Sequence, residues 1–185
     1  MRVFLTGATG FVGAAVVQEL IQAGHQVLGL TRSDSGAASL RAAGAQAHRG
    51  DLDDLESLRS GAAQADAVIH TAFNHDFSKY VENCETDRRV IEAMGEVLAS
   101  SGKMLIVTSG TGMAQAAGRP SNENDPPASS QVIPRAASEE SANSFASRGV
   151  KVVIVRLPQV HDTQKQGLVT YAIYAARQKG VSSEG

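Results

Sequence analysis

Short apolar runs alternate with helical patterns along this chain of 185 residues. The runs are rich in valine, isoleucine and leucine and are bounded by glycine or polar residues, which is typical of buried strands. Between them, apolar residues recur at the spacing of a helix face, and glycines follow where several of these patterns end. The pattern predicts strands at 2–6, 26–31, 45–49, 65–70, 103–109 and 151–157, and helices at 11–23, 37–43, 53–62, 80–100, 136–148 and 167–179.

This alternation predicts a single α/β fold. Strands that are joined by helices pair in parallel through right-handed crossovers, and the helices then cover both faces of the sheet. We therefore expect residues 1–185 to form one domain, a doubly wound parallel sheet (Rossmann fold) with strand order 3-2-1-4-5-6. Such a sheet binds its ligand at the carboxyl ends of the strands, where the order reverses between the first and fourth strands.

Residues 110–134 interrupt the pattern. They show no periodicity and are rich in glycine, proline, serine and asparagine. A long segment without regular structure is uncommon in a compact domain and is often functional. We expect this segment to be mobile without ligand, because it contains few apolar anchors.

Composition narrows the range of functions. The net charge is −2, with 42% hydrophobic and 19% charged residues, and there is no basic cluster, so a nucleic-acid partner is not expected. Cys84 is the only cysteine, which excludes an intramolecular disulfide and a cysteine-rich metal site and fits a reducing compartment. No apolar run approaches the length of a membrane span, and the first residues lack the layout of a signal peptide. The expected location is therefore the cytoplasm.

The first predicted strand leads directly into a glycine-rich turn and then into a helix. Gly7 would allow the tight turn, Gly10 would let phosphates approach the backbone, and Gly13 would let the helix pack close to the strand. The start of the helix offers N–H groups and a partial positive charge to an anion. Glycines at this spacing are a weak signal alone, and an ordinary strand–turn–helix is the alternative, but the context favours a dinucleotide site. Its expected contacts are Gly7, Thr9, Gly10, Phe11, Val12 and Gly13.

Arg32 bears on which dinucleotide binds, because it stands 19 residues after Gly13 at the end of the second predicted strand. An NAD site usually carries an acidic residue here for the ribose 2′-hydroxyl, whereas arginine suits a 2′-phosphate. Ser33 could add a hydroxyl to that contact. We therefore expect NADP, with NAD as the alternative because Asp34 could still serve it. A solvated arginine at a strand end is the plain interpretation of Arg32.

The turn at 6–13, Thr-Gly-Ala-Thr-Gly-Phe-Val-Gly, closely resembles that of extended and atypical short-chain dehydrogenase/reductases, also called NAD-dependent epimerase/dehydratases. The resemblance extends over the chain, through the segments at 50–54, 72–77 and 156–161. It implies an oxidoreductase or epimerase/dehydratase that acts on an unknown small carbonyl or hydroxyl compound. Relatives continue into a C-terminal substrate lobe, which is expected to be absent here. Helices 80–100 and 136–148 are similar to those that pair in family dimers, so a homodimer is one expected assembly.

The resemblance also implies roles for residues that follow the strands. Asp51 would meet the adenine and Leu52 would pack on its ring, although Asp51 could instead cap a helix. The nicotinamide would lie near Pro158 and His161. The ribose and pyrophosphate would be lined by His70, Thr71, Ala72 and Phe73.

His70 has two other interpretations. It could be a buried core histidine, or it could bind a metal. We see no metal-ligand pairing of His70 with His75 and Asp76, so no metal site is expected.

The main departure from the family concerns its catalytic pair, a tyrosine followed four residues later by a lysine. None of the three tyrosines here has that lysine, and the aligning positions hold Arg135 and Glu139. A guanidinium stays protonated and cannot act as a general base. We expect an Arg135–Glu139 ion pair on one helix face, with a substrate-anchoring Arg135 as the alternative.

The candidate catalytic residues that remain are Ser109, Arg135 and Asn83. Ser109 and Asn83 match residues that the family uses at its substrate, which favours an enzyme. The missing tyrosine–lysine pair favours a rival interpretation, a non-catalytic NADP-binding sensor or regulatory module. A Rossmann domain with an empty site is a third interpretation.

Overall fold

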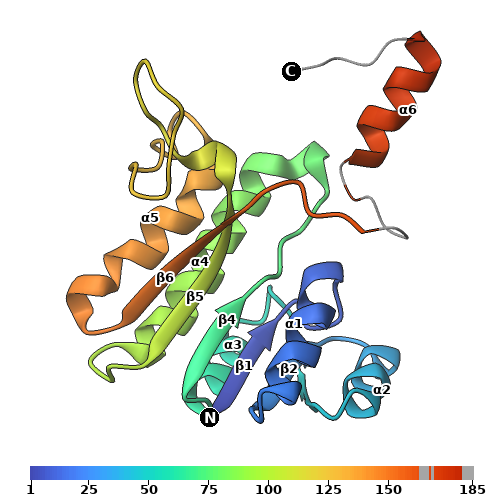
Figure 1. The fold of residues 1–185 in the computed structure, drawn as a ribbon. Coiled ribbons are helices and arrows are strands. Elements are labelled where there is room, and N and C mark those ends of the chain that lie inside the picture. Colours follow the sequence, from blue (N-terminus) through green and yellow to red (C-terminus); the bar gives the residue numbers. More distant parts are fainter. Residues whose placement is uncertain (163–166, 168, 181–185) are drawn as a thin grey trace.

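The computed structural model describes residues 1–162, 167 and 169–180, and it shows a six-stranded parallel sheet between two layers of helices (Figure 1). The strand order is β3-β2-β1-β4-β5-β6, and each neighbouring pair is parallel. The predicted fold and its order 3-2-1-4-5-6 are therefore confirmed. The strands are β1 (Arg2–Thr6), β2 (Gln26–Thr31), β3 (Gln46–Arg49), β4 (Ala67–His70), β5 (Met104–Gly110) and β6 (Lys151–Leu157).

The helices lie close to the predicted ranges, with two differences that have local causes. The second helix begins earlier than predicted because the Ser33 hydroxyl caps it, accepting a hydrogen bond from the Gly36 N–H at 3.0 Å. The fifth helix is shorter than predicted because the segments Pro134–Ala136 and Ala146–Arg148 wind as 3-10 turns. The helices are α1 (Phe11–Gln22), α2 (Asp34–Ala42), α3 (Leu55–Ala63), α4 (Tyr80–Leu98), α5 (Ala137–Ser144) and α6 (Val169–Lys179).

Two apolar cores stabilise the sheet, one on each face. Alternation along β1 sends the fully buried Phe4 into the core beneath α3, α4 and α5, and the fully buried Leu5 into the core beneath α1 and α2. Each core joins strand residues to helix residues, such as Leu58 of α3 on one face and Val17 of α1 on the other. The two layers fix the carboxyl ends of the strands along one edge.

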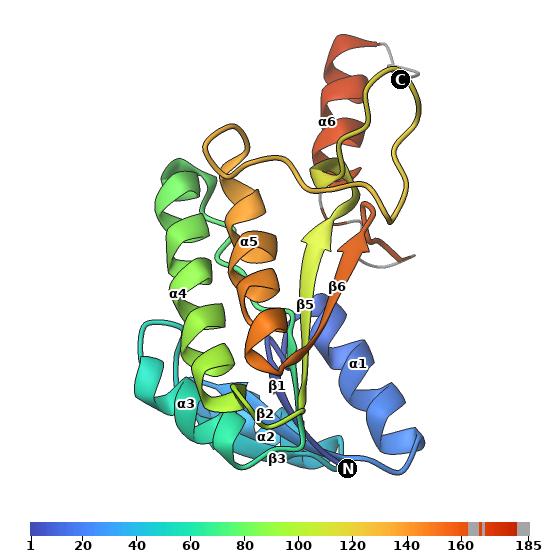
Figure 2. The same cartoon turned by 90° about the vertical axis from the view of Figure 1, so that its left-hand side faces the viewer.

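The sheet face beneath α1 and α2 is left partly open at β6. Val153 and Val155 point to this face and are 40% and 37% exposed. Helix α6 follows β6 but contains no buried residue, and Figures 1 and 2 show it extending away from the sheet. No helix in the described part of the chain is long and apolar enough to cross a membrane.

The segment at 110–134 has more structure than its sequence predicts. Thr111–Met113 form a 3-10 turn, and Ala114 pairs with Pro127 in an isolated antiparallel bridge. Asp125 and Ala128 are both buried. The expectation of a segment without regular structure was wrong for the Thr111–Met113 turn and the Ala114–Pro127 bridge, because such local backbone contacts leave no periodic trace in the sequence.

Candidate dinucleotide and substrate site

Backbone atoms pack closely around the glycine turn between β1 and α1. Gly7 has a φ of +69°, and a Cβ at Gly13 would lie only 2.0 Å from the Gly7 carbonyl oxygen, so neither position accepts a side chain without strain. The Gly10 N–H donates to the Gly7 carbonyl at 2.8 Å and closes the turn. Gly10 caps α1, and the first turn of that helix carries no acidic side chain. This cradle suits the pyrophosphate of a dinucleotide.

The turn borders the place where the strand order reverses. The Thr71 hydroxyl donates to the Thr6 carbonyl at 2.8 Å, and the Ala72 N–H donates to the Thr6 hydroxyl at 3.4 Å. These bonds join the end of β1 to the end of β4. Thr71 and Ala72, two predicted contacts of the ribose and pyrophosphate, therefore lie directly beside the turn.

The other predicted contacts of the turn differ in their exposure to solvent. Thr9 is exposed, whereas Phe11 and Val12 are half-buried at the start of α1. Phe11 and Val12 also line a groove of about 620 Å³ that runs along α1 toward Val160.

Arg32 and Asp51 meet at the rim beyond the turn. The Arg32 Nη1 lies 3.5 Å from the Asp51 Oδ2, and the two side chains are 82% and 35% exposed. Asp51 does not cap the next helix, because Asp54 does so by accepting the Ser57 N–H at 3.2 Å. Ser33 is occupied as the cap of α2, so its hydroxyl has a structural partner. Leu52 packs against the edge of one apolar core.

His70 lies inside the protein and not on the wall of the crevice. Its side chain is fully buried, with Nδ1 2.6 Å from the Thr6 hydroxyl and Nε2 2.9 Å from Asp87 Oδ1. The structure therefore supports the core interpretation for the imidazole. The proposed contact of His70 with the cofactor is left to its backbone.

Asp87 connects this histidine to Arg135. The Arg135 Nη1 donates to Asp87 Oδ2 at 2.9 Å, and the Ser138 hydroxyl donates to the same oxygen. Burial by itself raises the pKa of Asp87, but the charge interaction and hydrogen bond with His70, followed by Arg135 and Ser138, lower this pKa below its ordinary value. Asp87 is therefore a buried carboxylate that stays ionised.

The predicted Arg135–Glu139 ion pair was wrong. Arg135 turns toward Asp87, while Glu139 pairs with Arg156 through contacts of 2.8 and 3.0 Å. Arg135 belongs to a 3-10 turn and Glu139 to α5, so the spacing of a continuous α-helix does not apply. Each charge instead finds a partner on a neighbouring element. The Arg135 guanidinium also lies 4.3 Å above the centre of the Phe73 ring.

The candidate catalytic residues Ser109 and Asn83 already have partners in the protein. The Ser109 hydroxyl, at the end of β5, donates to the Glu139 carboxylate at 2.6 Å, and Glu139 is 1% exposed. The Asn83 side chain donates from Nδ2 to the Asp76 carbonyl at 2.8 Å. Both side chains are therefore held in place, and the Ser109 proton is engaged by Glu139.

The segment after β6 lies on the surface. Pro158 and His161 are exposed, and His161 Nδ1 lies 2.8 Å from the Gln159 carbonyl oxygen. These two predicted nicotinamide contacts remain proposals.

Sequence reasoning missed Asp87, Arg156 and Tyr80. Asp87 stands four residues after Asn83 on α4, and a charged residue on the buried face of a helix is a signal that could have found it. Tyr80 begins α4 at the crevice end. Burial raises the pKa of its phenol, the neighbouring Cys84 adds to the rise, and Arg135 opposes it.

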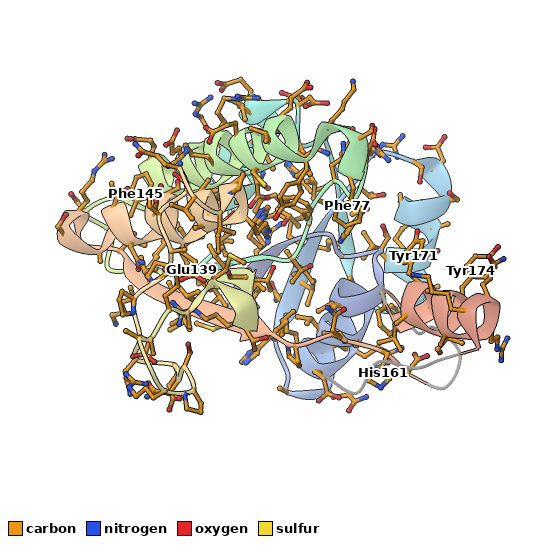
Figure 3. All side chains as sticks on the ribbon, turned by 90° about the horizontal axis from the view of Figure 1, so that it is seen from above. Phe77, Glu139, Phe145, His161, Tyr171 and Tyr174 are labelled. Carbon is orange, nitrogen blue, oxygen red and sulfur yellow. The ribbon has the colours of Figure 1, made fainter. Side chains whose placement is uncertain are left out.

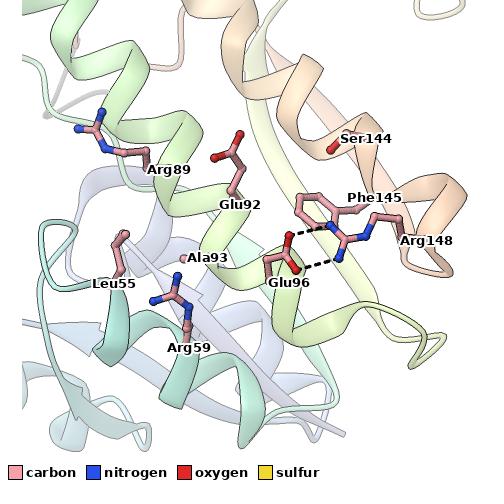
Figure 4. Close-up of a pocket in the computed structure, with 9 residues that line it drawn as sticks. All are labelled: Leu55, Arg59, Arg89, Glu92, Ala93, Glu96, Ser144, Phe145 and Arg148. Atoms are coloured by element: carbon pink, nitrogen blue, oxygen red, sulfur yellow. Dashed lines mark hydrogen bonds and ion pairs between the residues drawn. The ribbon is translucent and has the colours of Figure 1, made fainter.

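A hollow of about 480 Å³ lies between α3, α4 and α5, toward the opposite end of α4 from Tyr80 (Figure 4). Its side chains are mostly charged, and several are already paired. Arg148 binds the Glu96 carboxylate at 2.7 and 2.8 Å, as the dashed lines in Figure 4 show. We assign no ligand to this hollow.

Residues 3–180 match the family model of the NAD dependent epimerase/dehydratase family. The chain belongs to this family. The resemblance that was inferred from the glycine turn is therefore confirmed, and with it the NAD-binding Rossmann fold of the short-chain dehydrogenase/reductase superfamily.

Two relatives and one solved structure are similar to nearly the whole chain. An uncharacterised protein of Schizosaccharomyces pombe is 47% identical over 99% of this chain, and one of Saccharomyces cerevisiae is 42% identical over 98%. The chain spans 62% of the length of each of these relatives. The UDP-glucose 4-epimerase of Thermus thermophilus, solved in complex with NAD, is 26% identical with a TM-score of 0.73, over 98% of this chain and 64% of that one. The family assignment does not distinguish NADP from NAD.

Proposed function

We propose that residues 1–185 form one NADP(H)-binding domain and that it acts as an oxidoreductase on a small carbonyl or hydroxyl compound. The observation that carries the proposal is the backbone-walled turn from Gly7 to Gly13 beside the exposed Arg32. The turn would hold the pyrophosphate. Arg32 is 3.5 Å from Asp51 and 82% exposed, so its guanidinium has room to turn to a 2′-phosphate.

The residues around the crevice offer hydrogen-bond donors and a cation to a substrate oxygen. When bound, the nicotinamide supplies or accepts a hydride. The Tyr80 phenol is protonated at neutral pH and can donate a hydrogen bond to a substrate oxygen, but its raised pKa makes it a weaker acid. Ser109 would first have to release Glu139 before it could polarise a carbonyl. Arg135, above the Phe73 ring, is the proposed anchor for an anionic or carbonyl oxygen.

A non-catalytic NADP-binding sensor is the second candidate, and one specific observation favours it. The positions where the family carries its tyrosine and lysine hold Arg135 and Glu139, and both are bound to buried or half-buried partners. In that case NADP would be a ligand that stabilises one state of the protein.

Cofactor preference tests the proposed site. We expect NADP(H) to bind at least about tenfold more tightly than NAD(H), because one charge-assisted contact contributes about 1.5–3 kcal/mol. Arg32→Ala should remove this preference and leave the NAD affinity unchanged. Arg49→Ala is the matched control, since Arg49 is another exposed arginine at a strand end and pairs with Asp34. Calorimetric titration measures all of these affinities, and equal binding of the two cofactors by the unaltered protein would contradict the role of Arg32.

Turnover distinguishes the enzyme from the sensor. We expect consumption of NADPH with a panel of small carbonyl compounds and little turnover of UDP-sugars or simple alcohols, because the tyrosine–lysine pair is missing. Tyr80→Phe should lower turnover by about 10²-fold or more, as loss of a general acid does, without changing NADP affinity. NADP binding without turnover of any compound would instead support the sensor. Family-like turnover of UDP-sugars that Tyr80→Phe and Ser109→Ala leave unchanged would place the active site elsewhere.

A further inference from the structure

Four rings follow one another between the end of β4 and the start of α4. The ring centres of Phe73 and His75 are 5.6 Å apart, those of His75 and Phe77 are 6.1 Å apart, and those of Phe77 and Tyr80 are 6.1 Å apart. The whole chain contains five phenylalanines, three tyrosines and no tryptophan, so residues 73–80 hold an unusual share of its aromatic side chains. We call these four side chains the aromatic rim.

Hydrogen bonds hold the backbone of the aromatic rim. The Asp76 N–H donates to the Asn74 side chain at 3.0 Å, and the Ser78 N–H donates to the Asp76 side chain at 3.1 Å. Asn83 reaches back from α4 and donates to the Asp76 carbonyl at 2.8 Å. These bonds order the segment before any ligand arrives, which reduces the entropy lost on binding. Asn83 is thus a positioning residue for the rim.

The rim presents apolar surface to solvent at the crevice end of the sheet. Phe77 is 52% exposed and His75 is exposed, whereas Phe73 and Tyr80 are half-buried. Figure 3 looks down on this end of the molecule and shows Phe77 beside the first turn of α4. A single exposed phenylalanine needs no explanation, but a connected and ordered row of partly exposed rings is typical of a binding surface.

A cation stands at the inner end of the aromatic rim. The Arg135 guanidinium lies 4.3 Å above the Phe73 ring, and its N–H groups bind Asp87, Ser138 and the Thr108 carbonyl. Three of its five N–H groups are used by these partners, and the other two have no partner within the described part of the chain. They can receive a carboxylate or a carbonyl oxygen.

We infer that the aromatic rim and Arg135 bind a flat, conjugated carbonyl or carboxylate compound. The ring system of the compound would lie against Phe77 and Tyr80, and its oxygen would face Arg135. Aromatic rings attract one another in offset and edge-to-face arrangements, which a saturated ring cannot match. This inference deepens the proposed function, because it names the substrate class of the same crevice.

A pair of probe compounds tests this preference. The first is 2-naphthoate, which is flat and carries a carboxylate. The second is decahydronaphthalene-2-carboxylate, which has the same charge and carbon skeleton but no conjugation. Ligand-observed NMR titrations of the full chain, without NADP and with saturating NADP, should give an affinity for 2-naphthoate about tenfold higher than for the saturated compound.

Variants of Phe77 connect this preference to the rim. Phe77→Ala should weaken 2-naphthoate binding about tenfold, and Phe77→Leu should restore only part of it, because leucine replaces apolar area but not the ring. Tyr174→Ala is the matched control, since Tyr174 is 63% exposed on α6 and its loss should change nothing. NADP affinity, measured separately, should be the same in all of these proteins.

The outcomes separate the inference from the proposed function. Equal binding of the two probes, or binding that Phe77→Ala leaves unchanged, would overturn the assignment of the rim even if NADP binds. Selective and Phe77-dependent binding of 2-naphthoate in a protein that fails to bind NADP would uphold the rim as a ligand site and would refute the proposed cofactor.

Discussion

At the scale of single residues, one buried carboxylate connects three side chains beneath the candidate site. Asp87 is 3% exposed and binds His70, Arg135 and Ser138. Removing one partner of a buried ion pair leaves the other charge uncompensated, which costs about 3–5 kcal/mol. We therefore expect Asp87→Asn to lower the free energy of unfolding by an amount in this range, as measured by urea denaturation at neutral pH. Glu92→Gln, an exposed change on the same helix, should have almost no effect.

The same carboxylate sets the response of stability to acid. The pKa of Asp87 is lower in the folded protein than its ordinary value, so the folded state favours the ionised form. Its contribution to stability is complete above the pKa of the unfolded chain, about 3.9, and is lost as the pH falls through the lower, folded pKa. Asp87→Asn should therefore reduce the acid dependence of the unfolding free energy below about pH 4. Identical acid profiles for the two proteins would show that other carboxylates control this transition.

Single residues also show what sequence alone could and could not predict. Gly7 and Gly13 were predictable because only glycine fits a turn with a positive φ and a backbone contact of this kind. The partners of Arg135 and Glu139 were not, because Asp87 and Arg156 come from other elements and are brought near only by the fold. A rule based on spacing within one helix cannot predict ion pairs that form between different elements.

At the scale of elements, the glycine turn and α1 pack closely together, and this packing depends on Gly13. A Cβ at this position would meet the Gly7 carbonyl at 2.0 Å, so α1 would have to move away from β1. We expect Gly13→Ala to lower stability by about 1–3 kcal/mol, as overpacking does. The same shift should weaken NADP binding by at least about tenfold. Gly112→Ala is the control, because nothing lies within 4 Å of its added Cβ.

Calorimetry with NADP and thermal unfolding measure the two effects of Gly13→Ala. A variant that keeps its stability and loses binding would show that the glycine serves the ligand alone. A variant that keeps both its stability and its NADP affinity would mean that α1 adapts to the added methyl group and that the glycine turn tolerates the shift.

The bounds of the strands and helices show where the hydrophobic pattern of the sequence predicts secondary structure accurately. The strands β1, β2 and β4 follow their apolar runs closely, because burial on both faces requires mostly apolar residues. The edge strands β3 and β6 are less buried, and only β6 has a clear apolar run. The ends of α5 and the segment 110–134 were predicted less well. Both depend on 3-10 turns and on pairing such as the Ala114–Pro127 bridge, which are set by local backbone contacts and leave no hydrophobic period.

At the scale of the whole molecule, the strand order collects the candidate site at one edge of the sheet. Residues that are distant in the sequence, such as Gly10, Arg32 and Tyr80, all follow or border carboxyl ends of parallel strands. This arrangement was predictable from the alternation of strands and helices. The chemistry at the edge was less predictable, because the charges that occupy it come from α4, α5 and β6 together.

Helices cover the two faces of the sheet unequally. We therefore expect copies of the 185-residue chain to associate with one another. On the face beneath α1 and α2, Val153 and Val155 of β6 remain exposed, and a groove of about 620 Å³ along α1 is lined mainly by apolar residues. β6 is also an edge strand with one side of its backbone unpaired in the described part of the chain. Apolar surface of this kind promotes contact between copies in water. Sedimentation velocity should therefore show a larger average mass as the protein concentration rises.

The variant Val153→Lys/Val155→Lys tests which surface is responsible. Two charges on the open face should oppose its burial, and the chain should stay monomeric over the same concentrations. Val132→Lys is the control, because Val132 is 73% exposed in the segment 110–134 and should leave association unchanged. Association that survives the double change would instead point to the helices α4 and α5, which we expected from the family resemblance to pair in a homodimer. A chain that stays monomeric without any change would contradict both interfaces.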